Sequence, residues 1–409
     1  MVHVVSEIGR GGIDVARVRG LYPTLATGTA QLDGAFAALH PESVIRAIIS
    51  TLRSAPAQPG SRSSRSQQSA TRVLRTRRAA ADLVQGRAED VVLGDSTQSL
   101  LLRFTTLLSS DWQLGDEIVL SRLDADLAMR PWLRVARGRG VIVRWAEVDL
   151  ESGELPAWQY EKLISRRTRI VTVSLANAAT GMVPDVRAIA DLAHRHDALV
   201  VVDAGVAPAY LPLDIEELGA DLLAVAGPAF GGPTVAAIVA RPGLLDELND
   251  AVEGPPGAQR FEVPPLPIEL LDGFTAAVDH LADLDENAVG TRRERLVTSV
   301  GAAGDHTRSL YRRLDRGLRA LPGITVLGAP DRPLPVAAFT VAGRSPDDVG
   351  AFLHRRNISV WSGPSGMSEL LRAFGADELG GAVFVGLMPH TAASEIRQLL
   401  DALRALGPR

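Results

Sequence analysis

The chain has 409 residues, of which 43 are basic and 48 acidic, for a net charge of −5. It contains no cysteine, which excludes disulfide bonds, thiol nucleophiles and cysteine-ligated metals. The mild acidity argues against a nucleic-acid groove, no apolar run reaches the length of a membrane span, and the first ten residues do not resemble a signal peptide, so we expect a soluble cytoplasmic protein.

Strand-like and helix-like segments alternate between residues 90 and 240. A helix is expected to begin at Ser96-Thr97 and another after Pro184. The run 198–203 is apolar without alternation, which is typical of a strand covered on both faces. This order predicts an α/β fold with a mostly parallel sheet and right-handed crossovers. The expected strands are 90–94, 116–123, 141–149, 169–177, 198–203, 221–227 and 236–240.

The pattern changes near residue 290, where a charged helix begins. Ser345 is a typical N-cap, followed by Pro346 and two acids, so a helix is expected to start there. Another helix is expected from about Thr391. With strands expected at 324–328, 335–343, 357–363 and 382–388, this part predicts a smaller α+β domain. The stretch 54–70 has few apolar side chains and is expected to be a loop.

Two strand ends carry side chains suited to ligand binding. Asp203 ends the most apolar strand, at the edge where ligands sit in an open parallel sheet, although an Asp there can also cap a turn. Ser96 and Thr97 stand between a strand and a helix, where backbone N–H groups favour a phosphate, although both are also ordinary helix caps. His194 and His196 do not share a helix face, so we predict a solvated helix end and no metal site.

The order of these segments resembles the class V aminotransferases, and within them the cysteine desulfurase-like branch. The resemblance implies a fold-type I large domain over residues 31–289, with a mostly parallel seven-stranded sheet, and a smaller α+β domain from residues 1–30 with 290–409. It also implies a homodimer and the cofactor pyridoxal 5′-phosphate (PLP). The matching stretches are VARVRGLYPTL, DVVLGDSTQSLLL, LDADLAMRPWLR, VTVSLANAATGMVPDVRAIADLAHRHDALVVVDA, LPLDIEELGADLLAVAG with FGGP, RFE and VGLMPHTAASEI.

The lysine that this family uses has no counterpart here. A Schiff-base enzyme needs a lysine amine in its pocket, and Lys162 is the single lysine among the 43 basic residues. The family's lysine precedes an aromatic residue and a Gly-Pro pair. Phe230 and Gly232-Pro233 match that pattern, which places Ala229 at the lysine position. Lys162 lies in a charged helix before a strand, so we expect it at the amino-terminal end of the sheet.

Other positions that contact the cofactor in the family are also smaller or apolar here. Asp203 remains for the pyridine nitrogen, and Ser96 and Thr97 remain for the phosphate. Because each buried polar group without a partner costs ~1–3 kcal/mol, losing several together relieves a penalty in an empty pocket. We expect Asp203 to be paired with an arginine instead. The replaced positions are Ala125 for a ring-stacking histidine, Ala178 for an asparagine, Val206 for histidine or glutamine, and Pro264-Pro265 for Gly-Thr.

Three functions are compatible with these residues. The first is a non-catalytic homologue that binds a ligand or a partner. The second is an enzyme that holds PLP or its amine form (PMP) without a covalent bond. The third is an inactive subunit that pairs with an active relative. PLP therefore follows from the resemblance alone, and the sequence names no substrate.

Overall fold

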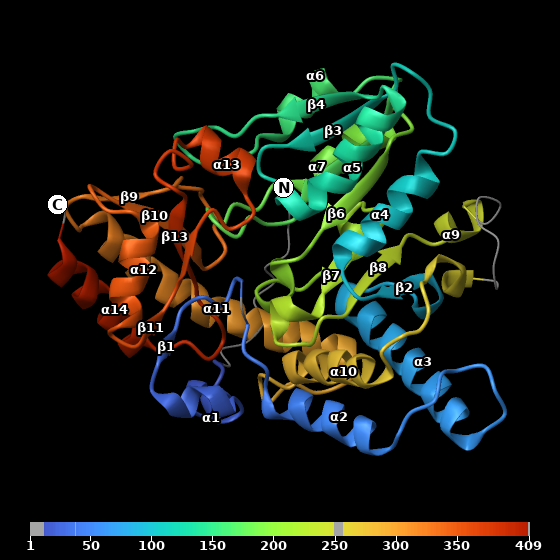
Figure 1. Ribbon diagram of the computed structural model, residues 1–409, viewed down its shortest axis with the longest axis horizontal. Coiled ribbons are helices and arrows are strands. Elements are labelled where there is room, and N and C mark those ends of the chain that lie inside the picture. The colour runs from blue at the N-terminus through green and yellow to red at the C-terminus, as the bar shows by residue number, and fades with distance from the viewer. Residues whose placement is uncertain (1–11, 37, 249–256, 408–409) are drawn as a thin grey trace.

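The computed structural model describes residues 12–36, 38–248 and 257–407. At its centre is a seven-stranded sheet in the order β2-β8-β7-β6-β5-β3-β4 (Figure 1). Strand β8 is antiparallel to both of its neighbours, and the other pairs are parallel. The expected mostly parallel seven-stranded sheet is confirmed. Its strands are β2 (Val91–Gly94), β3 (Glu117–Ser121), β4 (Ile142–Ala146), β5 (Thr168–Ser174), β6 (Leu199–Asp203), β7 (Leu222–Ala226) and β8 (Ala236–Ala240).

Helices cover both faces of this sheet, which explains its continuous apolar strands. Val200 and Val202 of β6 join the core on one face, and Val201 joins the core on the other. The first face is covered by α3 (Ser64–Val84), α7 (Val186–His194) and α10 (Ile268–Ala282); α2 (Glu42–Arg53) packs on α10. The second face is covered by α4 (Thr97–Leu108) and α5 (Asp126–Arg139). Shorter helices are α1 (Val15–Gly20), α6 (Tyr160–Leu163), α8 (Ile215–Leu218) and α9 (Leu244–Glu247).

The expected loop over residues 54–70 is wrong from residue 64 onward. Helix α3 begins there, and the Ser63 side chain accepts a hydrogen bond from the Ser66 backbone N–H as its N-cap. Ser66 and Ser69 are buried in the first turns. Small hydroxyl side chains thus occupy buried positions of α3, whereas the sequence prediction relied on apolar residues alone. Helix formation here depends on the cap and on tertiary contacts more than on hydrophobic pattern.

The C-terminal part forms a second, smaller sheet in the order β12-β13-β10-β9, with every pair antiparallel. Beside it, β1 (Ala30–Gln31) pairs in parallel with β11 (Ile358–Ser359). This architecture is the expected α+β arrangement; the domain boundaries at 30/31 and 289/290 remain a prediction. The other elements are β9 (Ile324–Val326), β10 (Val336–Val341), β12 (Trp361–Gly363), β13 (Ala382–Gly386), α11 (Arg292–Arg319), α12 (Pro346–His354), α13 (Ser368–Ala373) and α14 (Ala393–Leu406).

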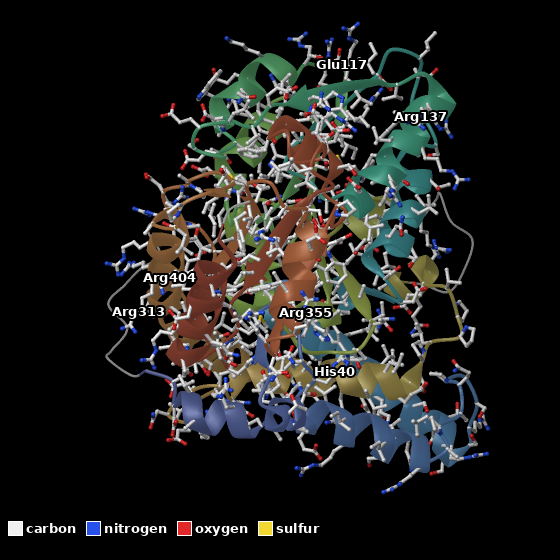
Figure 2. The ribbon with its side chains drawn as sticks, turned by 60° about the vertical axis from the view of Figure 1, so that its left-hand side comes forward. His40, Glu117, Arg137, Arg313, Arg355 and Arg404 are labelled. Carbon is white, nitrogen blue, oxygen red and sulfur yellow. The ribbon has the colours of Figure 1, made fainter. Side chains whose placement is uncertain are left out.

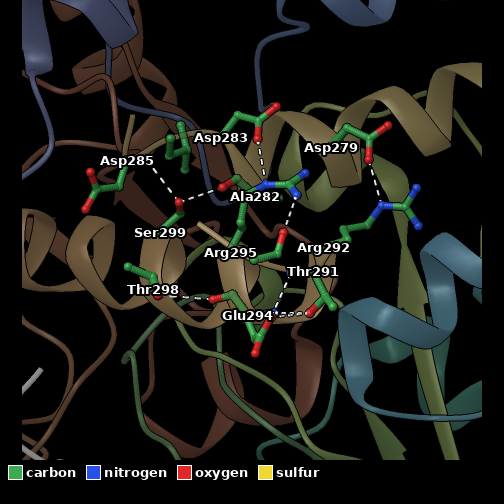
Figure 3. A network of polar contacts seen from close by, with 12 residues as sticks. Asp279, Ala282, Asp283, Asp285, Thr291, Arg292, Glu294, Arg295, Thr298 and Ser299 are labelled. Atoms are coloured by element: carbon green, nitrogen blue, oxygen red, sulfur yellow. Dashed lines mark hydrogen bonds and ion pairs between the residues drawn. The ribbon is translucent and has the colours of Figure 1, made fainter. Parts of the chain in front are cut away.

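A polar network fixes the junction between α10 and α11 (Figure 3). Thr291 and Glu294 form a capping box, in which each side chain accepts the other residue's backbone N–H. Arg292 makes an ion pair with Asp279 of α10 at 2.7 Å, and the Ser299 hydroxyl donates to the Ala282 carbonyl at 2.7 Å. The start of α11 is therefore held against α10 by side chains from both helices.

Many arginines lie on the surface, and Arg137, Arg313, Arg355 and Arg404, which Figure 2 labels, are all exposed. Four arginines of α3, at positions 72, 75, 77 and 78, also lie close together in the sequence, but Arg77 is buried and Arg72 pairs with Asp272 at 2.9 Å. Among the described residues, no helix has the length and apolar character to cross a bilayer. The first ten residues, on which the expected lack of a signal peptide rests, lie outside the described residues.

Candidate functional site

The candidate site lies at the carboxyl ends of the central strands. Asp203 is the last residue of β6 and aligns with Ser174 of β5 and Ala224 of β7. The turn after β7 is the short 3₁₀ helix Gly227–Phe230, which contains the partly buried Ala229. Asp203 and Ala229 therefore stand at the same edge of the sheet on neighbouring strands, where open α/β sheets bind ligands.

A small cavity opens beside Asp203. Its polar lining comes from two carboxylates, Asp124 and Asp203, and from Thr172 and Ser174 of β5. Leu101 of α4 and Trp132 of α5 supply much of its apolar lining. Its volume for a water-sized sphere is about 10 Å³, close to the space that one water molecule needs.

Asp203 has no arginine partner in the part of the chain that the structure describes, so the expected ion pair is wrong. Its Oδ1 accepts a hydrogen bond from the Gly205 backbone N–H at 2.9 Å. A Cβ at position 205 would lie 3.0 Å from that oxygen, so glycine permits the close approach. Burial raises the pKa of Asp203 to about 6, against the lowering effect of the Gly205 N–H, and the charge of Asp124 raises it further.

Asp124 is a second carboxylate of this site that the sequence analysis missed. It is buried and accepts the backbone N–H groups of Ser121 at 3.0 Å and Ser174 at 2.8 Å, and the Thr172 hydroxyl at 3.3 Å. Burial raises the pKa of Asp124, and the hydrogen bonds from Ser121 and Ser174 oppose the rise. The sequence signal for Asp124 was an acid three residues after a buried strand. The sequence prediction considered only its neighbour, Ala125.

The N-terminus of α4 is already occupied by side chains of the same segment. The Ser96 hydroxyl is the N-cap and accepts the Ser99 backbone N–H at 3.2 Å. The Ser99 hydroxyl donates to Asp95 Oδ1, which places the Asp95 carboxylate beside the first turn. Thr97 precedes the cavity residue Leu101 by one turn and shares its helix face. Of the two expected phosphate ligands, Ser96 thus serves as the N-cap and Thr97 is the partly buried first residue of α4.

In the loop after β5, the side chain of Asn177 forms hydrogen bonds with the backbone of the protein itself. The Asn177 amide donates to the Leu123 carbonyl at 2.8 Å, and its oxygen accepts the N–H groups of Ala179 at 2.8 Å and Thr180 at 3.0 Å. Asn177 and the adjacent Ala178 are both buried. This loop therefore keeps its shape without contributing Asn177 hydrogen bonds to a ligand in this conformation.

Lys162 lies away from Asp203 across the sheet. It belongs to α6, which packs beside the edge strand β4, three strands from β6. Its expected position at the amino-terminal end of the sheet stays a prediction, since Gln159, just before α6, hydrogen-bonds the backbone of Glu147 at the carboxyl end of β4. The Lys162 side chain is exposed, and its Nζ lies 5.7 Å from the centroid of the Trp158 ring. Partly buried Val206 follows Asp203 and brings no titratable group.

The RFE segment has a structural role in this chain. Glu262 is buried, pairs with Arg77 at 2.8 Å and accepts the Leu93 backbone N–H at 2.8 Å. Phe261 stacks on Phe104 of α4 with the ring centroids 5.7 Å apart. The following Pro264-Pro265 is exposed and offers no backbone N–H to an anion.

His194 lies exposed at the end of α7, as predicted, and it also has an acidic partner. It is the last residue of α7, but its Nε2 lies 2.9 Å from Asp221 Oδ2, and Asp221 also pairs with Arg241 at 2.7 Å. Within the described ranges, no group of three or more acidic or histidine side chains is arranged to hold a metal ion.

These residues do not fit PLP. Asp203 suits a protonated pyridine nitrogen, but the rest of this edge does not suit the cofactor. The α4 N-terminus, where the phosphate would bind, carries the Asp95 carboxylate. No lysine stands beside Asp203, because Lys162, the single lysine, lies in α6 next to the edge strand β4, three strands from β6.

The fold and the position of this site define the class: an α/β protein of the fold-type I, PLP-dependent transferase kind. The family model described as aminotransferase class-V matches residues 30–399, and the chain belongs to this family. An uncharacterized protein of Mycobacterium tuberculosis (strain CDC 1551 / Oshkosh) is 38% identical over 397 residues, which cover 96% of this chain and 99% of that protein.

Named relatives and solved structures point to the cysteine desulfurase-like branch. A probable cysteine desulfurase of Mycolicibacterium paratuberculosis is 29% identical over 338 residues, covering 78% of this chain and 48% of the relative. The apo structure of a cysteine desulfurase from Thermococcus onnurineus NA1 superposes with a TM-score of 0.85 at 22% identity, covering 98% of this chain and 99% of that one. The structural likeness supports the fold, and the sequence match supports the family.

Proposed function

We propose that this member of the class V aminotransferase family does not perform Schiff-base chemistry and acts as a ligand-binding homologue. The observation that carries the proposal is Ala229, on the turn after β7 where the family's lysine pattern falls. Alanine has no amine to form an aldimine and no group to move a substrate proton. Lys162 cannot replace it from α6, which lies beside the edge strand β4, three strands from β6.

The remaining groups at this edge are suited to binding. Asp203 presents a carboxylate oxygen beside the cavity, and Asp124 holds its own geometry through three hydrogen bonds. Asn177, Ser96 and Ser99 are engaged within their own loops. Such a site can recognise charge and shape without an activated nucleophile.

An assay with L-cysteine and added PLP tests the loss of chemistry. Purified protein is expected to release sulfide no faster than PLP alone, because no amine lies at the site. The Lys162→Arg variant is the matched control, since it removes the single lysine and keeps its charge. Turnover by the wild type that is lost in this variant would assign chemistry to Lys162, and turnover by both would indicate an enzyme that uses the cofactor without a covalent bond. Either result contradicts the proposal.

We also propose a homodimer, which the family resemblance implies. Its support in this chain is a group of exposed apolar side chains on two helices at the same side of the molecule, Ile49 and Leu52 of α2 and Leu74 of α3 (Figure 1). Large apolar side chains left exposed on one side of a protein are suited to burial against a partner. Sedimentation of the purified chain is expected to give twice the monomer mass; a monomer that dimerises only with a lysine-bearing relative would favour the partner-subunit alternative.

A further inference from the structure

Helix α5 carries a row of arginines on its outer face. Arg130, Arg134 and Arg137 follow the spacing i, i+4 and i+7, so they lie along one side of the helix. All three are exposed, whereas Met129 and Trp132 of the same helix are buried in the core beside the sheet. At 1.5 Å per residue, this α5 arginine row is about 10 Å long. It forms a line of positive charge that faces solvent.

The α5 arginine row has no acidic partner in the part of the chain that the structure describes. Its three side chains make neither an ion pair nor a hydrogen bond with any described residue. The single acid of α5, Asp126, instead accepts hydrogen bonds from the Ser368 backbone N–H and hydroxyl. On α7, by contrast, Arg187 pairs with Asp191 one turn away, at 2.8 Å. The described residues therefore leave the charge of the row without a counter-charge.

A surface hollow lies along this row. The three arginines line it together with Leu133 and Gly138, and it has about 510 Å³ of space for a water-sized sphere. Leu127, which is 51% exposed, lies one turn before Arg130 on the same side of the helix. Because all of these residues belong to one helix, the hollow is open to solvent on its far side. Small-molecule sites enclose most of their ligand, so this hollow is better suited to contact with another macromolecule.

We propose that the outer face of α5 is a docking surface for an acidic segment of a partner protein. Charge complementarity identifies the partner, because a guanidinium group without an internal partner is matched best by a carboxylate, which it can bind through two hydrogen bonds. Leu127 and Leu133 flank the row and add apolar contact. The net charge of −5 disfavours a nucleic acid as the occupant. Trp132, which lines the cavity beside Asp203, lies on the buried side of α5, so this surface is separate from the proposed ligand site.

The test measures the binding of two synthetic helical peptides that differ only in charge. One carries Glu at positions i, i+4 and i+7 with leucines beside them, and the other carries Gln at those three positions. Fluorescence anisotropy at constant ionic strength gives their affinities for the wild type and for two variants. The row variant changes all three arginines of the α5 arginine row to glutamine. The control variant removes the same charge from three exposed arginines of α11 that have no acidic partner among the described residues, Arg312→Gln, Arg313→Gln and Arg316→Gln.

The wild type is expected to bind the Glu peptide about tenfold more tightly than the Gln peptide, a difference of about 1.4 kcal/mol. The row variant is expected to lose this preference and the α11 variant to keep it, with thermal melts showing that both are folded. Equal binding of the two peptides by the wild type overturns the proposal, as does an equal loss of preference in the two variants. Tighter binding of a short oligothymidine than of the Glu peptide, lost in the row variant, would replace the acidic protein by a nucleic acid.

Discussion

Asp203 shows how one side chain can be costly to the fold while useful to a site. It places a carboxylate at the end of a mostly apolar strand. This carboxylate accepts the Gly205 backbone N–H, and the charge of Asp124 acts on it as well. Burial without a cation favours the protonated form. Its pKa of about 6, against about 4 in an unfolded chain, means that the native state binds this proton more readily. The free energy of unfolding contributed by Asp203 therefore falls as the pH rises from about 4 to about 6.

We accordingly expect Asp203→Asn to be more stable than the wild type at pH 8, by about 1–2 kcal/mol, because it removes a charge that burial disfavours. This gain in stability is smaller than the full pKa shift of Asp203 would give, because the side chain is partly exposed to solvent. Urea unfolding at pH 8 and at pH 4 provides the measurement and its own control. Near pH 4 the carboxyl is protonated in the native wild type, so the two proteins should differ little. An equal loss of stability at both pH values would contradict this account.

At the scale of elements, a buried ion pair joins three segments that are distant in sequence. Arg77 of α3 pairs with Glu262, and Arg77 also donates to the Val91 carbonyl at the start of β2. Glu262 in turn accepts the Leu93 N–H of the same strand. β2 is an edge strand of the large sheet, so this pair secures an edge that has a neighbour on one side only.

Removing one partner of this pair should be more harmful than removing both. Arg77→Met is expected to lower the free energy of unfolding by about 3–5 kcal/mol, because it leaves the Glu262 carboxylate buried without a cation. The double variant Arg77→Met with Glu262→Leu should recover much of that loss. Arg78→Met is the control, as Arg78 is exposed on the same helix and should change stability by less than about 0.5 kcal/mol. Urea unfolding of the four proteins gives the comparison, and similar values for Arg77→Met and Arg78→Met would refute the role of the pair.

The large-sheet strands were predictable because burial on both faces leaves a continuous apolar run, as in β6 and β8. The start of α3 was not, since Ser66 and Ser69 are buried without being apolar. The position of Asp203 at a strand end was also predictable from the sequence. Its lack of an arginine was not, because a chain with many arginines gives no indication of which of them reach a given carboxylate. Tertiary contacts decide that, as Arg77 and Glu262 illustrate.

Across the whole molecule, a buried aromatic and histidine cluster connects the N-terminal segment, α10 and the loop before α14. The Tyr22 hydroxyl lies 2.8 Å from His280 Nε2, and the Tyr22 ring centroid lies 4.8 Å from that of His390. Arg19 donates to the His390 carbonyl and pairs with Glu395 at 2.9 Å. Burial lowers the pKa of His280 to about 4 and that of His390 to about 3, with Arg17 and Arg19 lowering them further.

This cluster should make the fold sensitive to acid. An unfolded histidine has a pKa near 6.5. Below that pH the unfolded chain therefore binds two protons that His280 and His390 do not bind in the native state. The free energy of unfolding consequently falls as the pH drops toward 4. The loss is up to about 1.4 kcal/mol per pH unit for each histidine, partly offset by proton uptake at Asp203. His280→Gln should flatten the dependence of unfolding free energy on pH between 7 and 5, whereas His354→Gln, an exposed histidine at the end of α12, should leave it unchanged. Urea unfolding could instead give His280→Gln the same change of unfolding free energy with pH as the wild type. The acid sensitivity would then come from other groups, and protonation of this histidine cluster would not be coupled to folding.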